Sequence, residues 1–226
     1  MNKNTWTDIS GWTGANWATW YPESGSYWIY VEAVTNEGVT ANKCIGYVID
    51  SRYAIMGSSS TTLSQMVNYY NANQAYPEFY RGSDAPTIQA FCQIYIQECQ
   101  AEGVKVEVAF CQAMKETGFL RYGGDVSIGQ YNFAGLGATG NGNPGESFGS
   151  VREGVRAQVQ HLKAYASTDP LNNPCVDKRF ALVARGSAPY VEWLGIKENP
   201  YGKGWATAKN YGYSIKNDYM KKLFSY

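Results

Sequence analysis

The stretch Val106–Gly140, VEVAFCQAMKETGFLRYGGDVSIGQYNFAGLGATG, joins a helical pattern to a glycine-rich segment. Small and apolar residues recur in its first part at the spacing of one face of an α-helix. Gly118 follows where a residue in the left-handed conformation commonly ends a helix. The sequence therefore predicts a helix over 106–117 and, after it, a lobe of glycine-rich loops.

Glu116 stands at the end of this predicted helix, on the same face as Ala109 and Ala113. Two methyl side chains leave room for a ligand beside the carboxylate. The negative end of the helix dipole disfavours its ionised form, and Phe119 and Leu120 would desolvate it. Both effects raise a carboxyl pKa, as a general acid working near neutral pH requires. By position alone, a surface Glu at a helix end fits equally well.

Helices are also predicted on both sides of this stretch. One covers about residues 63–71, and the next is capped by Ser83 or Asp84 and ends at residue 103. Beyond the loop lobe, Ser150 and Glu153 form a capping box for a long helix. The part of the chain after residue 57 is therefore expected to be nearly all helix, with glycine-rich loops in place of a sheet.

The C-terminal part continues this helical pattern. A short helix is expected to present Glu192 and Trp193, and the tail carries Tyr211 in a stripe of helical spacing. His161 lies on the long helix without a Ser or Cys nucleophile in a partner motif, so we interpret it as structural.

Residues 1–57 differ in composition from the rest of the chain, because five of the seven tryptophans lie there. Residues 27–35 and 43–50 are β-branched and aromatic, with a turn signal between them. This pattern predicts a small β module, followed by a second domain over 58–226. The module resembles the closing strands of immunoglobulin-like modules of the triple-tyrosine type, in partial form. We expect its tryptophans to pack in a core and between the domains, a sugar-stacking surface being the alternative.

Composition excludes several classes of function. The 226 residues carry a formal net charge of zero, which argues against a nucleic-acid binder. No apolar run is long enough to span a membrane, and the first ten residues lack the apolar core of a secretory signal. Five cysteines without a C-x-x-C pair and one histidine offer no zinc site, so we expect mostly buried thiols rather than disulfides, no cofactor and no metal. We expect a monomer.

Four motifs carry a specific resemblance. A-x-x-E-T-G at Ala113–Gly118 is followed by YNFAGLGA at Tyr131–Ala138, then by FGSVREGVRAQVQHL and GWATAKNYG. In order and spacing they resemble the bacterial peptidoglycan glucosaminidases of glycoside hydrolase family 73, over about residues 60–226. The resemblance implies a lysozyme-like, mainly α (α+β) fold. It implies an enzyme that cleaves peptidoglycan glycan strands after N-acetylglucosamine. It also implies a secreted or cell-wall-associated autolysin, or a phage-type lysin, whose signal is absent from this chain.

The resemblance also assigns roles to residues. Glu116 would be the general acid that protonates the leaving glycosidic oxygen, and Tyr211 would lie beside the reacting sugar. The segment Asn132–Leu136 would form the cleft wall behind Glu116. The candidate substrate-binding residues are Tyr131, Asn132, Phe133, Gly135 and Trp193.

The second catalytic group stays open. Many family members carry a second Glu on a β-hairpin, but the matching interval here is short and its only acid is Glu146. Asp125 is the other nearby candidate. Carboxyl groups about 5–5.5 Å apart indicate retention, and about 6.5–9.5 Å indicate inversion. Substrate-assisted attack by the 2-acetamido group is the third option.

Two further functions remain as alternatives. A muramidase or lytic transglycosylase would use the same acid but cut the other linkage. A non-catalytic wall-binding protein would use the many Tyr and Trp side chains against sugar rings, with Glu116 incidental.

Overall fold

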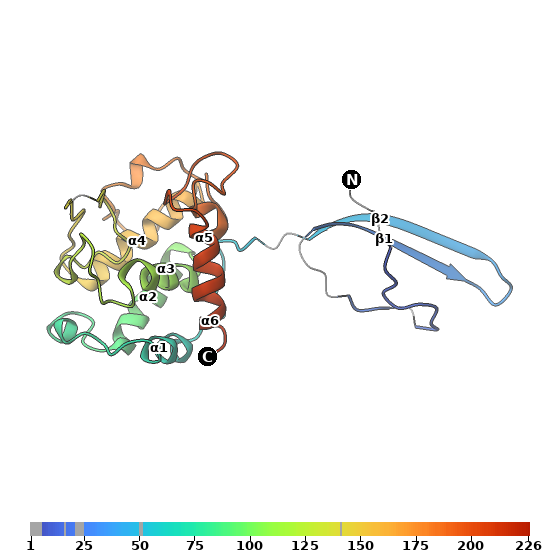
Figure 1. Ribbon diagram of the computed structural model, residues 1–226, viewed down its shortest axis with the longest axis horizontal. Coiled ribbons are helices and arrows are strands. Elements are labelled where there is room, and N and C mark those ends of the chain that lie inside the picture. The colour runs from blue at the N-terminus through green and yellow to red at the C-terminus, as the bar shows by residue number, and fades with distance from the viewer. Residues whose placement is uncertain (1–5, 16, 21–24, 50–51, 141) are drawn as a thin grey trace. The chain divides into compact units, whose positions relative to one another are not determined.

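The computed structural model describes residues 6–15, 17–20, 25–49, 52–140 and 142–226. The chain forms two compact units, Met1–Ser51 and Arg52–Tyr226. The second unit is mainly helical and the first holds a small sheet, which confirms the expected mainly α class with a small β module (Figure 1). Among the described residues, no helix is both long enough and apolar enough to cross a bilayer.

The first unit is a β-hairpin in its described residues. Strands β1 (Gly25–Val34) and β2 (Thr40–Ile49) pair antiparallel, with Trp28 opposite Gly46. The connection turns at Gly38, whose φ of 81° favours glycine. Two paired strands do not make the sandwich of an immunoglobulin-like module, so that resemblance does not extend to the described architecture.

The tryptophans of this unit are mostly exposed. Trp6, Trp12, Trp17 and Trp28 each keep about 70% of their surface accessible. The expectation that they pack in a core was wrong for these four. The physical reason is that a single two-stranded layer has no second layer to cover its faces within the part of the unit that is described.

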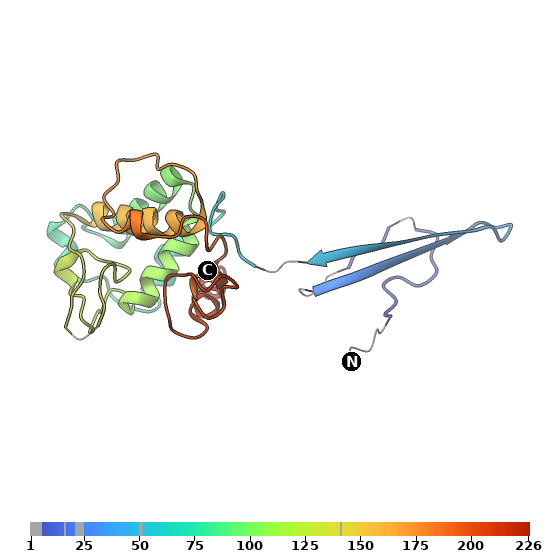
Figure 2. The same cartoon turned by 90° about the horizontal axis from the view of Figure 1, so that it is seen from above.

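The second unit is built around helix α3 (Val106–Thr117). It packs against α2 (Ile88–Glu102), α4 (Val151–Ala166) and the C-terminal helical segment, and α1 (Leu63–Asn71) packs against α2 and the end of that segment. That last segment comprises α5 (Tyr211–Ser214), a π-helical turn over Ile215–Met220, and α6 (Lys221–Leu223). Single 3-10 turns occupy Glu78–Gly82, Ile128–Gln130, Phe180–Leu182 and Val191–Leu194. The glycine-rich segment 118–149 and the C-terminal segment lie on opposite sides of α3 (Figures 1 and 2).

Helix ends confirm part of the expected capping. Gly118 ends α3 with a φ of 57°, as predicted. Thr87 caps α2, so the prediction of Ser83 or Asp84 was wrong. Asp84 instead accepts hydrogen bonds from the first amides of α4, at 2.9 and 3.0 Å. Its carboxylate therefore ties the loop before α2 to the start of α4, where a helix dipole favours negative charge.

Ser150 caps α4 only by half of the expected capping box. Its hydroxyl oxygen accepts the amide of Glu153 at 3.1 Å. The Glu153 carboxylate, however, accepts from the amide of Gly149 at 2.7 Å rather than from Ser150. Glu153 is thus occupied at the helix terminus, in keeping with a structural role.

The boundary between the units lies six residues before the expected one. Residues 52–57 belong to the second unit because Ile55 is fully buried there. The Ile55 amide donates to Pro189 at 3.0 Å, and its carbonyl accepts from Lys105 at 2.9 Å. Backbone hydrogen bonds therefore hold this short segment in the helical unit.

A pair of fragments tests this boundary. We expect residues 52–226 to fold cooperatively, and residues 58–226 to melt at a lower temperature. Burial of Ile55 alone is worth about 2 kcal/mol, or roughly 4–8 °C in Tm for a unit of this size. Differential scanning calorimetry of both fragments measures the difference. Equal Tm values would show that residues 52–57 do not belong to the folded unit.

Candidate active site

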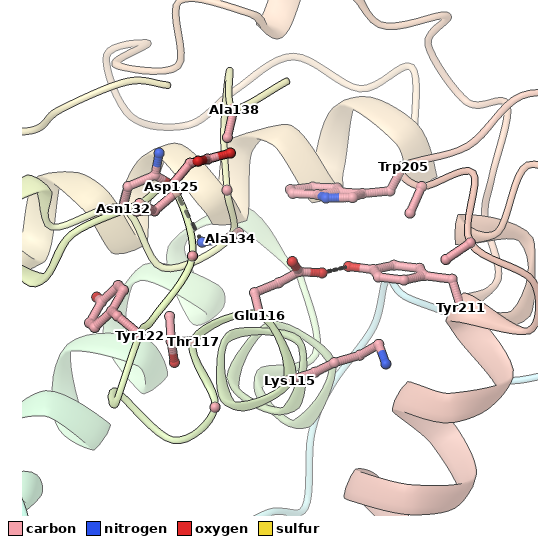
Figure 3. A pocket seen from close by; sticks show the side chains of 16 residues that line it. Lys115, Glu116, Thr117, Tyr122, Asp125, Asn132, Ala134, Ala138, Trp205 and Tyr211 are labelled. Atoms are coloured by element: carbon pink, nitrogen blue, oxygen red, sulfur yellow. Dashed lines mark hydrogen bonds between the residues drawn. The ribbon is translucent and has the colours of Figure 1, made fainter. Parts of the chain in front are cut away.

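Glu116 is one of only two residues of α3 that are not buried, the other being Lys115. The helix is covered by neighbours along the rest of its length, so its last turn is where it meets solvent. There it borders a pocket of about 600 Å³ (Figure 3). The pocket is lined from three parts of the chain: 115–126, 132–138 and 205–211.

The Glu116 carboxylate faces the open pocket but has protein packed around its other sides. Burial by these surroundings raises its pKa, and this is the largest effect. A hydrogen bond from Tyr211 and the positive charge of Lys115 act in the opposite direction and offset only part of it. The group therefore holds a proton to higher pH than an ordinary Glu while remaining open to a ligand.

Tyr211 is the hydrogen-bond partner of Glu116. Its hydroxyl donates to Glu116 Oε1, and Figure 3 shows the two side chains pointing toward each other. Tyr211 is buried, and burial together with the charge of Glu116 raises the phenol pKa well above its usual value. It is thus a neutral donor that holds one carboxyl oxygen.

The predicted wall segment, Asn132–Leu136, forms part of the pocket wall through Asn132 and Gly135. The Asn132 amide binds its own loop, accepting from Leu136 N at 2.9 Å and donating to Leu136 O at 2.9 Å. Gly135 has a φ of 64°, and a Cβ built there would lie 3.9 Å from Glu116 Oε2. The loop is therefore shaped to pass close to the second oxygen of Glu116.

Three other predicted binding residues do not line the pocket. Phe133 is buried in the core, with its ring centroid 5.2 Å from that of Phe91. Tyr131 packs its ring against Tyr80 at 6.2 Å. Trp193 lies edge-on to Tyr201 at 5.7 Å, elsewhere on the unit.

The two candidates for a second acid are separated by the structure. Asp125 lines the pocket, and its carboxylate accepts from Gly142 N at 3.2 Å. Glu146 is not among the lining residues and forms an ion pair with Lys178 at 2.9 Å. Asp125 is thus the carboxylate that shares the pocket with Glu116. Within the described ranges, no group of three His, Cys, Asp or Glu residues is arranged to hold a metal ion.

Trp205 is a pocket residue that the predicted site residues did not include, although it stands in the quoted segment GWATAKNYG. His161 packs against it edge-on, with 4.7 Å between the ring centroids, and is held by Asp177 at 2.7 Å. His161 therefore supports the aromatic wall without lining the pocket. A carboxyl group of raised pKa, a phenol and an indole together suit acid-assisted chemistry on a neutral, ring-shaped ligand.

The cysteines divide by location. Cys92, Cys99 and Cys111 are buried in the core as free thiols, as expected. Cys44 and Cys175 are also free but exposed, so the expectation of mostly buried thiols holds for three of the five.

Comparison with known proteins gives a family and a relative. The family model Glucosaminidase, described as mannosyl-glycoprotein endo-beta-N-acetylglucosaminidase, matches residues 92–225. An uncharacterized protein of Borreliella burgdorferi is 37% identical over 169 residues, which cover 75% of this chain and 76% of that protein. No solved structure matches the chain significantly.

Proposed function

Because the chain belongs to the glucosaminidase family of glycoside hydrolases, we propose that it hydrolyses the β-1,4 bond after N-acetylglucosamine in peptidoglycan. The observation that carries the proposal is Glu116, a carboxyl group of raised pKa that faces a pocket inside the matched range. The family description names an endo-beta-N-acetylglucosaminidase, and the sequence resemblance supports a bacterial wall substrate. On the same grounds, we propose that the protein acts outside the cell or at the cell wall.

In the proposed reaction, Glu116 transfers its proton to the glycosidic oxygen as the bond to the anomeric carbon breaks. The proton comes from a group whose burial favours the neutral form. Tyr211 holds Oε1, which leaves Oε2, on the side of Gly135, for the transfer. Water then adds to the anomeric carbon, and its proton restores the acid or passes to a second base.

For the second group, we propose Asp125 or the 2-acetamido oxygen of the substrate. Asp125 is favoured over Glu146 because it lines the pocket, whereas Glu146 is paired with Lys178 outside it. The configuration of the first sugar product separates the routes. An inverted product supports water activated by Asp125, and a retained product supports attack by the acetamido oxygen or by the carboxylate itself.

Mass spectrometry of digested peptidoglycan tests the bond that is cut. We expect soluble fragments with N-acetylglucosamine at the reducing end. A reducing-end muramic acid would indicate a muramidase, and an anhydro sugar would indicate a lytic transglycosylase. Absence of any soluble fragments on several wall types, with wall binding intact, would leave a non-catalytic binding protein.

A further inference from the structure

A chain of buried hydrogen bonds leads from α2 across the core to Glu116. Tyr95 donates to Gln158 Oε1 at 2.8 Å, and Gln158 Nε2 donates to Gln112 Oε1 at 2.9 Å. Gln112 Nε2 donates to the Tyr211 hydroxyl at 3.1 Å, and Tyr211 donates to Glu116. Tyr95, Gln112 and Gln158 are fully buried, so these hydrogen bonds are shielded from bulk solvent.

The direction of this chain is set by a backbone carbonyl. Gln158 Nε2 also donates to the carbonyl oxygen of Ala109 at 2.9 Å. A carbonyl only accepts, so the NH₂ end of Gln158 must face α3. Its second N–H then requires an acceptor from Gln112, which turns the NH₂ end of Gln112 toward Tyr211.

The consequence falls on the hydroxyl proton of Tyr211. With an N–H donor on one side, the phenol oxygen is an acceptor there, and its own proton must point to Glu116. If Gln112 were turned over, its oxygen would compete with Glu116 for that proton. A hydrogen bond from Gln112 also polarises the phenol and strengthens its donation to the carboxylate.

We propose that Gln158 and Gln112 are positioning residues that hold the Tyr211 hydroxyl in donation to Glu116 and thereby tune the proton affinity of the acid. The catalytic meaning of this arrangement rests on the proposed function of Glu116. The effect on Glu116 itself does not, because it is a property of the resting protein. Donation from the Tyr211 hydroxyl stabilises the ionised carboxylate. Disrupting the hydrogen bonds that orient this hydroxyl therefore raises the pKa of Glu116.

The test is a carboxyl-carbon NMR titration of Glu116 in the full chain, with the signal assigned by Glu116→Gln. Gln158→Met frees the Gln112 amide to turn, and we expect the pKa of Glu116 to rise by about 0.5–1 unit, the size of one hydrogen bond. Tyr211→Phe sets the upper limit of the shift. Should Gln158→Met not fold, Gln112→Met carries the test, with an upward shift of smaller size.

Two controls separate this role from general damage to the core. Gln160 is equally buried on α4, but its amide binds Pro174 O and Val176 N, each at 2.9 Å, away from Glu116. Tyr95→Phe removes the far end of the chain and leaves the Ala109 anchor in place. We expect both Gln160→Met and Tyr95→Phe to leave the pKa of Glu116 within about 0.2 unit of wild type.

The outcomes are distinct. An unchanged Glu116 pKa in both Gln158→Met and Gln112→Met overturns the proposal, as does an equal shift in Gln160→Met. The Glu116 pKa can shift in Gln158→Met and Gln112→Met but not in the controls, while the protein releases no wall fragments. That result supports the positioning role and contradicts the proposed hydrolase function. In an active enzyme, the alkaline limb of kcat/KM should move upward with the NMR value.

Discussion

Glu116→Gln is expected to lower the rate of peptidoglycan hydrolysis by about 10²–10⁴-fold, the usual contribution of a general acid. The substituted amide keeps the shape of the side chain and still offers an oxygen to Tyr211. It has no acidic proton to give to the leaving oxygen. Wall binding should therefore change little, because the pocket and its aromatic wall stay in place. Release of reducing ends from purified walls, alongside a wall co-sedimentation assay, measures both quantities.

Glu146→Gln is the matched control for this substitution. It removes a carboxylate from the same lobe, and its ion pair with Lys178 is half exposed and contributes little to stability. We expect its rate to stay within about twofold of wild type, since its side chain does not line the pocket. More than a tenth of the rate surviving in Glu116→Gln would contradict the assignment of the acid. A large loss in Glu146→Gln would contradict the preference for Asp125.

Gly154→Ala is expected to cause a large loss of stability from one added methyl group. In an ordinary helix interior this change stabilises by about 1 kcal/mol. Here the new Cβ would overlap the carbonyl oxygen of Tyr131 and lie 2.9 Å from its carbon. Because backbone cannot move aside as a flexible side chain does, we expect a net destabilisation of about 3 kcal/mol. Thermal unfolding measures it as a drop in Tm of roughly 6–12 °C.

Gly82→Ala provides the comparison, since a Cβ there meets no atom within 4 Å and no positive φ is involved. We expect its Tm to lie within about 2 °C of wild type. A Gly154→Ala protein as stable as wild type would show that α4 does not pack directly on the backbone at Tyr131.

The helices were predicted well because the apolar spacing and the residues that end a helix are both visible in a short stretch of sequence. The apolar stripe and Gly118 were enough to define α3, and the covered length of that helix leaves Glu116 at its exposed end. Capping by contrast depended on distant partners. Asp84 binds the start of α4, 67 residues away in sequence, so no local rule could assign it there.

The site was predictable only where a motif carried it. Glu116 and Tyr211 stand in quoted segments, and the structure brings them into contact. Trp205 stands in the same segment as Tyr211, yet spacing alone does not say which of its residues face a pocket. Gln112 and Gln158 have no sequence signal, because buried glutamines acquire a role only through partners on other helices.

In the first unit the strands could be predicted from the sequence, but their packing could not. Its strands were predicted from alternation and a turn signal, and the hairpin confirms them in outline. Alternation does not reveal whether a second layer covers the strands. Trp28 was expected to pack in a core, but its side chain is exposed.

The central claim is that Glu116 delivers the proton during cleavage, and one comparison tests it most directly. The pKa of Glu116 is measured by carboxyl-carbon NMR in the free protein, and kcat/KM for wall hydrolysis is measured across the same pH range. Since the acid must be protonated to act, activity should fall as pH rises through the Glu116 pKa, which burial places above that of an ordinary Glu. The account predicts that the alkaline limb of kcat/KM coincides with the NMR value. An alkaline limb that lies elsewhere, or that persists unchanged in Glu116→Gln, would contradict it.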